Sequence, residues 1–220
     1  GYDLDPSFVS VVPLGGRFVS HFWRLLNDLE IPYLTLLDLD RERRAGGWVT
    51  IKYVLKELIK LNPSAEFRQS LLSVRNGDGT KRTLTDNELQ EMHTLDDKSI
   101  ELIAGWFPHL RKHGIFFSSP LDLDFLMLKA FPKAYQKVAG NSDGPRGLGK
   151  DGLFTDVRVK KAVSAVLGNE GGDGGSYSDD ECQLFPWYTY LFYSRGKPTT
   201  HTVAWLELDP EEQANYMPEP

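Results

Sequence analysis

Hydrophobic and polar positions follow two different periods in the N-terminal part of the chain. The β-rich apolar run over 8–12 predicts a strand that stops in the turn with glycines 15–16. From Arg17 the apolar residues follow the helical period, on a face that contains Phe18, Phe22, Leu25, Leu26 and Leu29. The apolar run over 33–37 predicts a second strand. Strand, helix and strand in this order predict a βαβ crossover and therefore a parallel pair.

The middle of the chain changes character after a second amphipathic helix. That helix follows the glycines at 46–47 and is predicted by the apolar positions Trp48, Ile51, Leu55, Leu58 and Ile59. Residues 62–112 are charged and helix-prone, and we expect helices there over 65–74, 84–92 and 99–107. The sequence therefore predicts a helical insertion at 62–112, between two parts of an α/β core at 1–61 and 113–220.

The third strand is predicted over 114–117, and a helix is expected to follow it at once. Ser119 would be the N-cap of that helix and Pro120 its first residue. Further helices are expected over 155–167 and 183–193.

Two segments rich in Gly, Asp and Ser, 140–152 and 168–181, have too little apolar content to pack and are predicted to be loops. Within the first, 144–150 nearly matches a phosphate-binding P-loop. However, Asp151 stands where that motif needs a Ser or Thr for Mg²⁺, and no strand precedes it. A P-loop is therefore not expected.

Composition limits the class of protein and of partner. With 40 % hydrophobic residues in 220, the chain can form a substantial core. The net charge of −6 means that a DNA partner would need a local basic patch or a metal bridge to phosphate. The single cysteine, Cys182, excludes an internal disulfide framework and fits a reducing compartment. Since no long apolar span or signal-like N-terminus is present, we expect a soluble cytoplasmic protein without a membrane partner.

Paired aspartates follow two of the predicted strands. Asp38 and Asp40 come after 33–37, and Asp122 and Asp124 come after 114–117. Residues two apart on a strand project to the same side, and the strand ends of open α/β sheets hold ligands. Close carboxylates repel one another unless a cation or a proton lies between them, which favours Mg²⁺ or Mn²⁺.

Each of these signals also has a simpler interpretation. Aspartate is common where a strand meets a loop, and Asp122 lies three residues after Ser119, where it would complete a capping box. Lys197 is ordinarily a solvated surface lysine, and His201 is interpreted as a structural helix residue. The basic residues after the first pair would contact phosphates near the metal or form a solvated loop; they are Arg41, Arg43 and Arg44.

Three segments together resemble the Toprim domain of the overcoming lysogenization defect (OLD) family of nucleases. The first is the run 11–16 followed by a helix and 36–40, which reads Val-Val-Pro-Leu-Gly-Gly and Leu-Leu-Asp-Leu-Asp. The second is 115–124, Ile-Phe-Phe-Ser-Ser-Pro-Leu-Asp-Leu-Asp, after the insertion. The third is 195–198, Arg-Gly-Lys-Pro, which is similar to the C-terminal lysine loop of that family.

The resemblance implies a Toprim-like α/β fold, a small parallel sheet flanked by helices with a helical insertion. It implies a DNA endonuclease or nickase that uses two Mg²⁺ or Mn²⁺ ions, and an N-terminal ATPase domain through which the protein forms homo-oligomers. By position, Asp38 and Asp40 would bind metal, Asp122 and Asp124 would complete the second site together with Ser119, and Lys197 would stabilise charge at the phosphate.

One departure from the family pattern keeps a second class of function open. Toprim domains carry a glutamate at the end of a first strand, upstream of the glycine turn, and no glutamate precedes Gly15 here. A degenerate, non-catalytic Toprim module for dimerisation or docking is therefore the alternative. A haloacid-dehalogenase-type phosphatase is disfavoured, because Glu42 stands where that class has Thr or Val.

Overall fold

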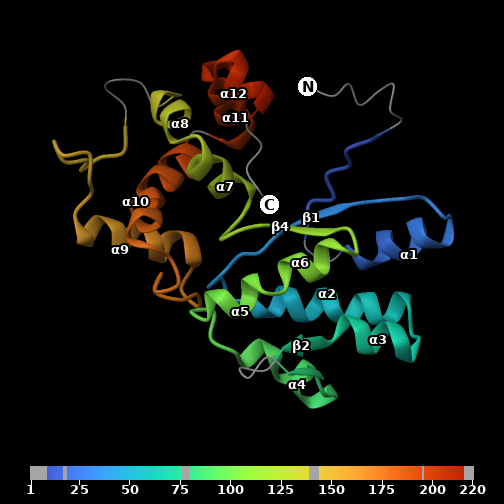
Figure 1. Ribbon diagram of the computed structural model, residues 1–220. Helices are drawn as coiled ribbons and strands as arrows, with labels where there is room; N and C mark the ends of the chain where they lie inside the picture. Colours follow the sequence, from blue (N-terminus) through green and yellow to red (C-terminus); the bar gives the residue numbers. More distant parts are fainter. Residues whose placement is uncertain (1–8, 17–18, 76–79, 139–143, 195, 216–220) are drawn as a thin grey trace.

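The computed structural model describes residues 9–16, 19–75, 80–138, 144–194 and 196–215 (Figure 1). At its centre β1 (Thr35–Asp38) and β4 (Ile115–Ser118) form a parallel pair in which Asp38 lies opposite Ser118. Helices flank this pair, with α1 to α6 on one side and α7 to α12 on the other (Figure 1). The mixed α/β class with a small parallel sheet is confirmed.

The strand predicted over 8–12 is wrong for residues 9–12, which form no strand. Val9, Val11 and Val12 are all at least half exposed, because no neighbouring strand among the described residues pairs with this segment. The predicted crossover between 8–12 and 33–37 is therefore not formed. The parallel partner of β1 is β4, which comes much later in the chain.

Helix α1 (Ser20–Asp28) forms, but its buried face differs from the predicted one. Leu25 and Leu29 are exposed, whereas Trp23 is buried and donates a hydrogen bond from Nε1 to Thr35 Oγ1 at 2.9 Å. The predicted face also included Phe18, which lies outside the described residues. A tryptophan indole can pack against apolar neighbours and donate a hydrogen bond at the same time, which favours burial of Trp23 over the leucines of the predicted face.

Helix α2 (Trp48–Leu61) confirms its prediction, because Trp48, Ile51, Leu55 and Leu58 are all buried.

The predicted insertion contains helices and also a β-hairpin that the sequence analysis missed. The hairpin pairs β2 (Ser73–Arg75) antiparallel to β3 (Lys81–Thr83), so the helix expected over 65–74 ends early. Residues 76–79, between the two strands, lie outside the described residues. The helical elements of this stretch are α3 (Ala65–Leu71), α4 (Asp86–Glu91), η1 (Met92–Thr94), α5 (Ile100–Ala104) and α6 (Phe107–Arg111).

After β4 the described chain is helical. The helix after β4 begins at Leu123 rather than beside Ser119, a difference that matters for the site. The elements are α7 (Leu123–Ala130), α8 (Pro132–Val138), α9 (Asp156–Leu167), α10 (Asp179–Tyr188), the π-helix η2 (Thr189–Ser194), α11 (Lys197–Glu207) and α12 (Pro210–Asn215). None of the helices in the described ranges is both long and apolar enough to cross a bilayer.

Buried apolar side chains form two clusters that meet near the ends of the strands. One combines β1, β4 and α2 with residues of the insertion, including Leu71, Leu89 and Ile103. The other starts at Leu121 and combines α7 to α11. The insertion thus packs into the same core as the sheet, and the aspartates that follow the two strands lie between the clusters.

Candidate functional site

Asp38 is the last residue of β1 and is exposed. Its Oδ1 accepts a hydrogen bond from Ser118 Oγ at 2.8 Å and one from the Leu123 backbone N–H at 3.3 Å. The parallel register places Ser118 directly opposite Asp38, so the strand pairing itself orients this carboxylate. Asp38 therefore lies where both strands and the start of α7 converge.

Asp40 does not share a strand face with Asp38, contrary to the prediction. The strand ends at Asp38, and Asp40 has a positive φ of 53°, so the alternation of a strand no longer applies. The Asp40 N–H donates to Leu121 O at 2.7 Å, and its buried carboxylate accepts from Arg43 Nη1 at 2.6 Å.

Asp122 is the N-cap of α7, a role that the sequence analysis gave to Ser119. Its Oδ1 accepts from the Phe125 N–H at 3.0 Å, and its Oδ2 accepts from Tyr188 Oη at 2.6 Å. Arg43 Nη1 lies 3.4 Å from the same Oδ2. Burial raises the pKa of Asp122, although the hydrogen bond from Tyr188 opposes that rise. Ser119 stays in the connection before the helix.

Asp124 lies in the first turn of α7, is buried, and contacts two cationic or titratable groups of α11. Lys197 Nζ forms an ion pair with its Oδ2, and His201 Nε2 lies 2.9 Å from its Oδ1. Burial raises the pKa of Asp124, but the hydrogen bonds from His201 and Lys197 outweigh it and lower the pKa overall.

His201 was interpreted as structural, and the structure places it in the site. Its Nδ1 lies 2.6 Å from Tyr135 Oη, which completes a chain from Tyr135 through His201 to Asp124. The signal in the sequence was the four-residue spacing from Lys197, which puts both side chains on one face of a helix.

Lys197 is the first residue of α11 and forms an ion pair with Asp124 in the first turn of α7. Burial lowers its pKa, but contact with Asp124 and the charges of Asp122 and Asp38 raise it overall. The structure therefore brings together four of the predicted site residues, Asp38, Asp122, Asp124 and Lys197.

The arginines after Asp40 do not form the exposed basic loop that the sequence indicated. Arg41 is buried, donates from Nη2 to Ser176 O at 2.6 Å, and stacks 4.8 Å from the Tyr177 ring centre. Arg43 is held by Asp40 and Asp122, as described above. Arg44 alone is exposed, and it pairs with Glu170 at 2.6 Å. Contact of Arg41 and Arg43 with DNA is therefore not supported, because their guanidinium groups form hydrogen bonds and ion pairs inside the protein.

The loop after β1 is fixed from two sides. Asp97 of the insertion accepts hydrogen bonds from the backbone N–H groups of Glu42 at 2.8 Å and Trp48 at 3.2 Å. The Glu42 carboxylate accepts from the N–H groups of Gly174 at 2.7 Å and Ser176 at 2.5 Å. The segment 168–181 was expected not to pack, yet its backbone amides enclose this glutamate.

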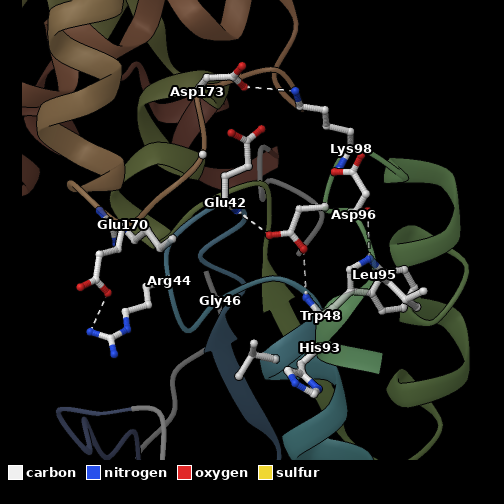
Figure 2. A pocket seen from close by; sticks show the side chains of 14 residues that line it. Glu42, Arg44, Gly46, Trp48, His93, Leu95, Asp96, Lys98, Glu170 and Asp173 are labelled. Carbon is white, nitrogen blue, oxygen red and sulfur yellow. Dashed lines mark hydrogen bonds and ion pairs between the residues drawn. The ribbon is translucent and has the colours of Figure 1, made fainter. Parts of the chain in front are cut away.

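A cavity of about 450 Å³ opens where these three segments meet (Figure 2). Figure 2 shows ion pairs across it, Lys98 with Asp173 and Arg44 with Glu170. Because its charged groups pair with one another, the cavity does not present a charge of one sign.

The acidic residues fit a hard divalent cation in their chemistry, since carboxylate oxygens are the ligands that Mg²⁺ and Mn²⁺ prefer. Lys197 already places a positive charge among Asp38, Asp122 and Asp124. No group of three or more His, Cys, Asp or Glu side chains in the described part of the chain is arranged to hold a metal ion. The carboxylates therefore form no ready metal site in the described residues, because Lys197 is paired with Asp124 and Asp40 is engaged by Arg43.

Comparison with known proteins gives one finding. Residues 1–40 match the family model described as overcoming lysogenization defect protein-like, TOPRIM domain. No curated protein and no solved structure matches the chain. The match includes Asp38 and Asp40 and confirms the first of the three segments of the resemblance, and it indicates a nuclease-related role. Residues 1–40 are thus similar to the TOPRIM domain of overcoming lysogenization defect-like proteins, within a mixed α/β chain that has a small parallel sheet.

Proposed function

We propose that this chain is the catalytic region of a metal-dependent endonuclease that hydrolyses phosphodiester bonds in DNA. The observation that carries the proposal is the ion pair of Lys197 with Asp124 in the first turn of α7, whose first residue, Leu123, donates its backbone N–H to Asp38. The TOPRIM match supports the same class of chemistry. As in the resemblance, we propose an N-terminal ATPase domain and homo-oligomers as the context of this region.

The residues have separate roles in this proposal. Asp38, Asp122 and Asp124 would hold Mg²⁺ or Mn²⁺, and Ser118 orients Asp38 through its hydrogen bond. Divalent cations bound to such carboxylates polarise a phosphate oxygen and lower the pKa of a bound water. Lys197, released from Asp124, would offset the negative charge that builds on the non-bridging phosphate oxygens.

A second cation places a stricter demand on the site. It requires Asp40 to leave Arg43, and Arg43 is also held by Asp122 and by Val166 O at 3.1 Å. Titration with Mn²⁺ followed by electron paramagnetic resonance measures the number of bound ions directly. The two-ion mechanism predicts that Asp40→Asn removes one of two ions, and a single ion in the wild type would contradict it.

Nicking of supercoiled plasmid in Mg²⁺ or Mn²⁺ tests the function. Asp38→Ala should abolish nicking, because it removes the exposed carboxylate at the centre of the site. Asp28→Ala changes an exposed aspartate on α1 and serves as the matched control. Nicking that survives both Asp38→Ala and a chelator would exclude the proposed reaction.

The alternative is a non-catalytic Toprim module for dimerisation or docking. It is favoured by the ion pairs that already neutralise Asp40, Asp122 and Asp124. A folded chain that binds no Mn²⁺ and leaves plasmid intact would favour this alternative.

A further inference from the structure

A groove of about 800 Å³ lies between the segment that begins at Gly144, α9 and the π-helix η2. Three cationic residues, Arg146, Arg158 and Lys161, line it together with Tyr190 and Tyr193, and no carboxylate is among its lining residues. In a chain with a net charge of −6, this local excess of positive charge is unusual.

The cations of the groove differ from those around the acidic site. Arg43, Arg44 and Lys197 each form an ion pair within the protein. By contrast, neither Arg158 nor Lys161 forms an ion pair with any residue that the structure describes, and the same holds for Arg146. The Nε of Arg158 is also buried without a hydrogen-bond partner in that part of the chain. An unused buried donor beside unpaired charges indicates an external anion.

The aromatic residues indicate what carries that anion. Tyr193 is 53 % exposed, and Tyr190 lines the same groove. Exposed aromatic rings beside a basic groove bind single-stranded nucleic acid, because bases stack on the rings while cations follow the phosphates. An anionic protein segment has no bases that could stack on the tyrosine rings.

The groove borders the chain segment that leads to Lys197. Ser194 lines the groove at the end of η2, and Lys197 follows three residues later. Three residues of chain span at most ~11 Å, so the Cα atom of Lys197 lies within that distance of the Cα atom of Ser194.

We propose that this groove binds the phosphates and unpaired bases of a single DNA strand and directs it toward the acidic site. The inference rests on the proposed nuclease function. It assigns the DNA contacts to Arg146, Arg158 and Lys161 in place of Arg41 and Arg43.

Fluorescence anisotropy with a labelled oligothymidylate in a chelator measures binding without hydrolysis. The double variant Arg158→Gln/Lys161→Gln should bind at least ~10-fold more weakly, and the slope of log K against log salt should fall by about 1.4, for two lost phosphate contacts. Lys133→Gln/Lys160→Gln is the matched control, since it changes the net charge equally at exposed lysines outside the groove. The control should stay within about twofold of the wild type.

Tyr193→Leu should weaken oligothymidylate binding at least ~5-fold while leaving the salt slope unchanged, because it removes stacking and no charge. Thermal unfolding by circular dichroism confirms that each variant is folded. Equal affinities of the groove variant and its control would overturn the proposal, and so would polyglutamate that competes as well as the oligonucleotide.

Plasmid nicking separates this inference from the proposed function. Binding that depends on the groove, without nicking by the wild type, supports the groove and rejects the nuclease. Nicking by the wild type, together with binding that the groove substitutions leave unchanged, supports the nuclease and rejects the groove.

Discussion

At the scale of single residues, the contact between Lys197 and Asp124 joins the proposed phosphate-stabilising cation to a proposed metal ligand. Lys197→Ala should lower the nicking rate at least ~100-fold, as expected for a lost electrostatic stabiliser. The same variant should keep or increase its affinity for Mn²⁺, because the ammonium competes for the carboxylate. Asp124→Asn should instead weaken Mn²⁺ binding.

Nicking rate and thermal stability, measured on the same variants, distinguish a functional lysine from a structural one. If Lys197 only supports the fold, Lys197→Ala should change thermal stability and nicking in parallel, and Lys197→Arg should restore both. Unchanged nicking in a folded Lys197→Ala variant would contradict the assigned role.

The pH dependence of stability provides a second test at this scale. The pKa of Asp124 lies below the ordinary value of 3.8, since His201 and Lys197 outweigh the effect of burial. A lowered carboxyl pKa stabilises the folded state above the unfolded pKa, and this contribution is lost as the pH falls through the folded pKa. Urea unfolding should therefore show a steeper loss of stability below about pH 4 in the wild type than in Asp124→Asn. Parallel curves would contradict the ion pair.

At the scale of elements, the loop that follows β1 is built around a close approach of two backbone segments. A Cβ placed on Gly46 would lie 1.7 Å from Asp40 O, so no side chain fits there unless the loop shifts. Gly46→Ala should lower the free energy of unfolding by about 2 kcal/mol or more, through overpacking. It should also displace Asp40 and lower activity.

Gly16→Ala is the matched control for this change, because a Cβ there meets nothing within 4 Å. Its effect on stability should stay within about 0.5 kcal/mol. Chemical denaturation of the two variants gives both values, and equal stability would show that the loop is not tightly held.

At the scale of the whole molecule, Arg43 connects the two hydrophobic clusters. It pairs with Asp40 beside the sheet and with Asp122 at the start of α7, and it donates to Val166 O on α9. Arg43→Ala should cost about 3–5 kcal/mol of stability, because it leaves two buried carboxylates without their cation.

Arg44→Ala is the control at the neighbouring position. Its ion pair with Glu170 is exposed to solvent, so its loss should cost less than about 1 kcal/mol. Chemical denaturation compares the two, and similar losses would mean that Arg43 is not the link between the clusters.

The sequence by itself determined the elements whose signal is local. The periodicity of α2, the apolar runs of β1 and β4, and the paired aspartates behind those strands were all sufficient to place the acidic site. The lysine segment could be singled out as well because its motif is contiguous, and its similarity to the lysine loop of the family stays a prediction.

Only the tertiary structure decided how those residues are used. Val9, Val11 and Val12 have the pattern of a strand, but a strand needs a partner, and none of the described segments pairs with them. Likewise, Asp40 and Asp122 have ordinary sequence environments, yet each is neutralised by Arg43. Asp40 pairs with an arginine only three residues away, but the partner of Asp122 and the burial of both carboxylates depend on residues distant in the chain, about which a local pattern holds no information. For this reason the sequence located the carboxylates, while the fold determined that Lys197 pairs with Asp124 and that Arg41 and Arg43 are internal.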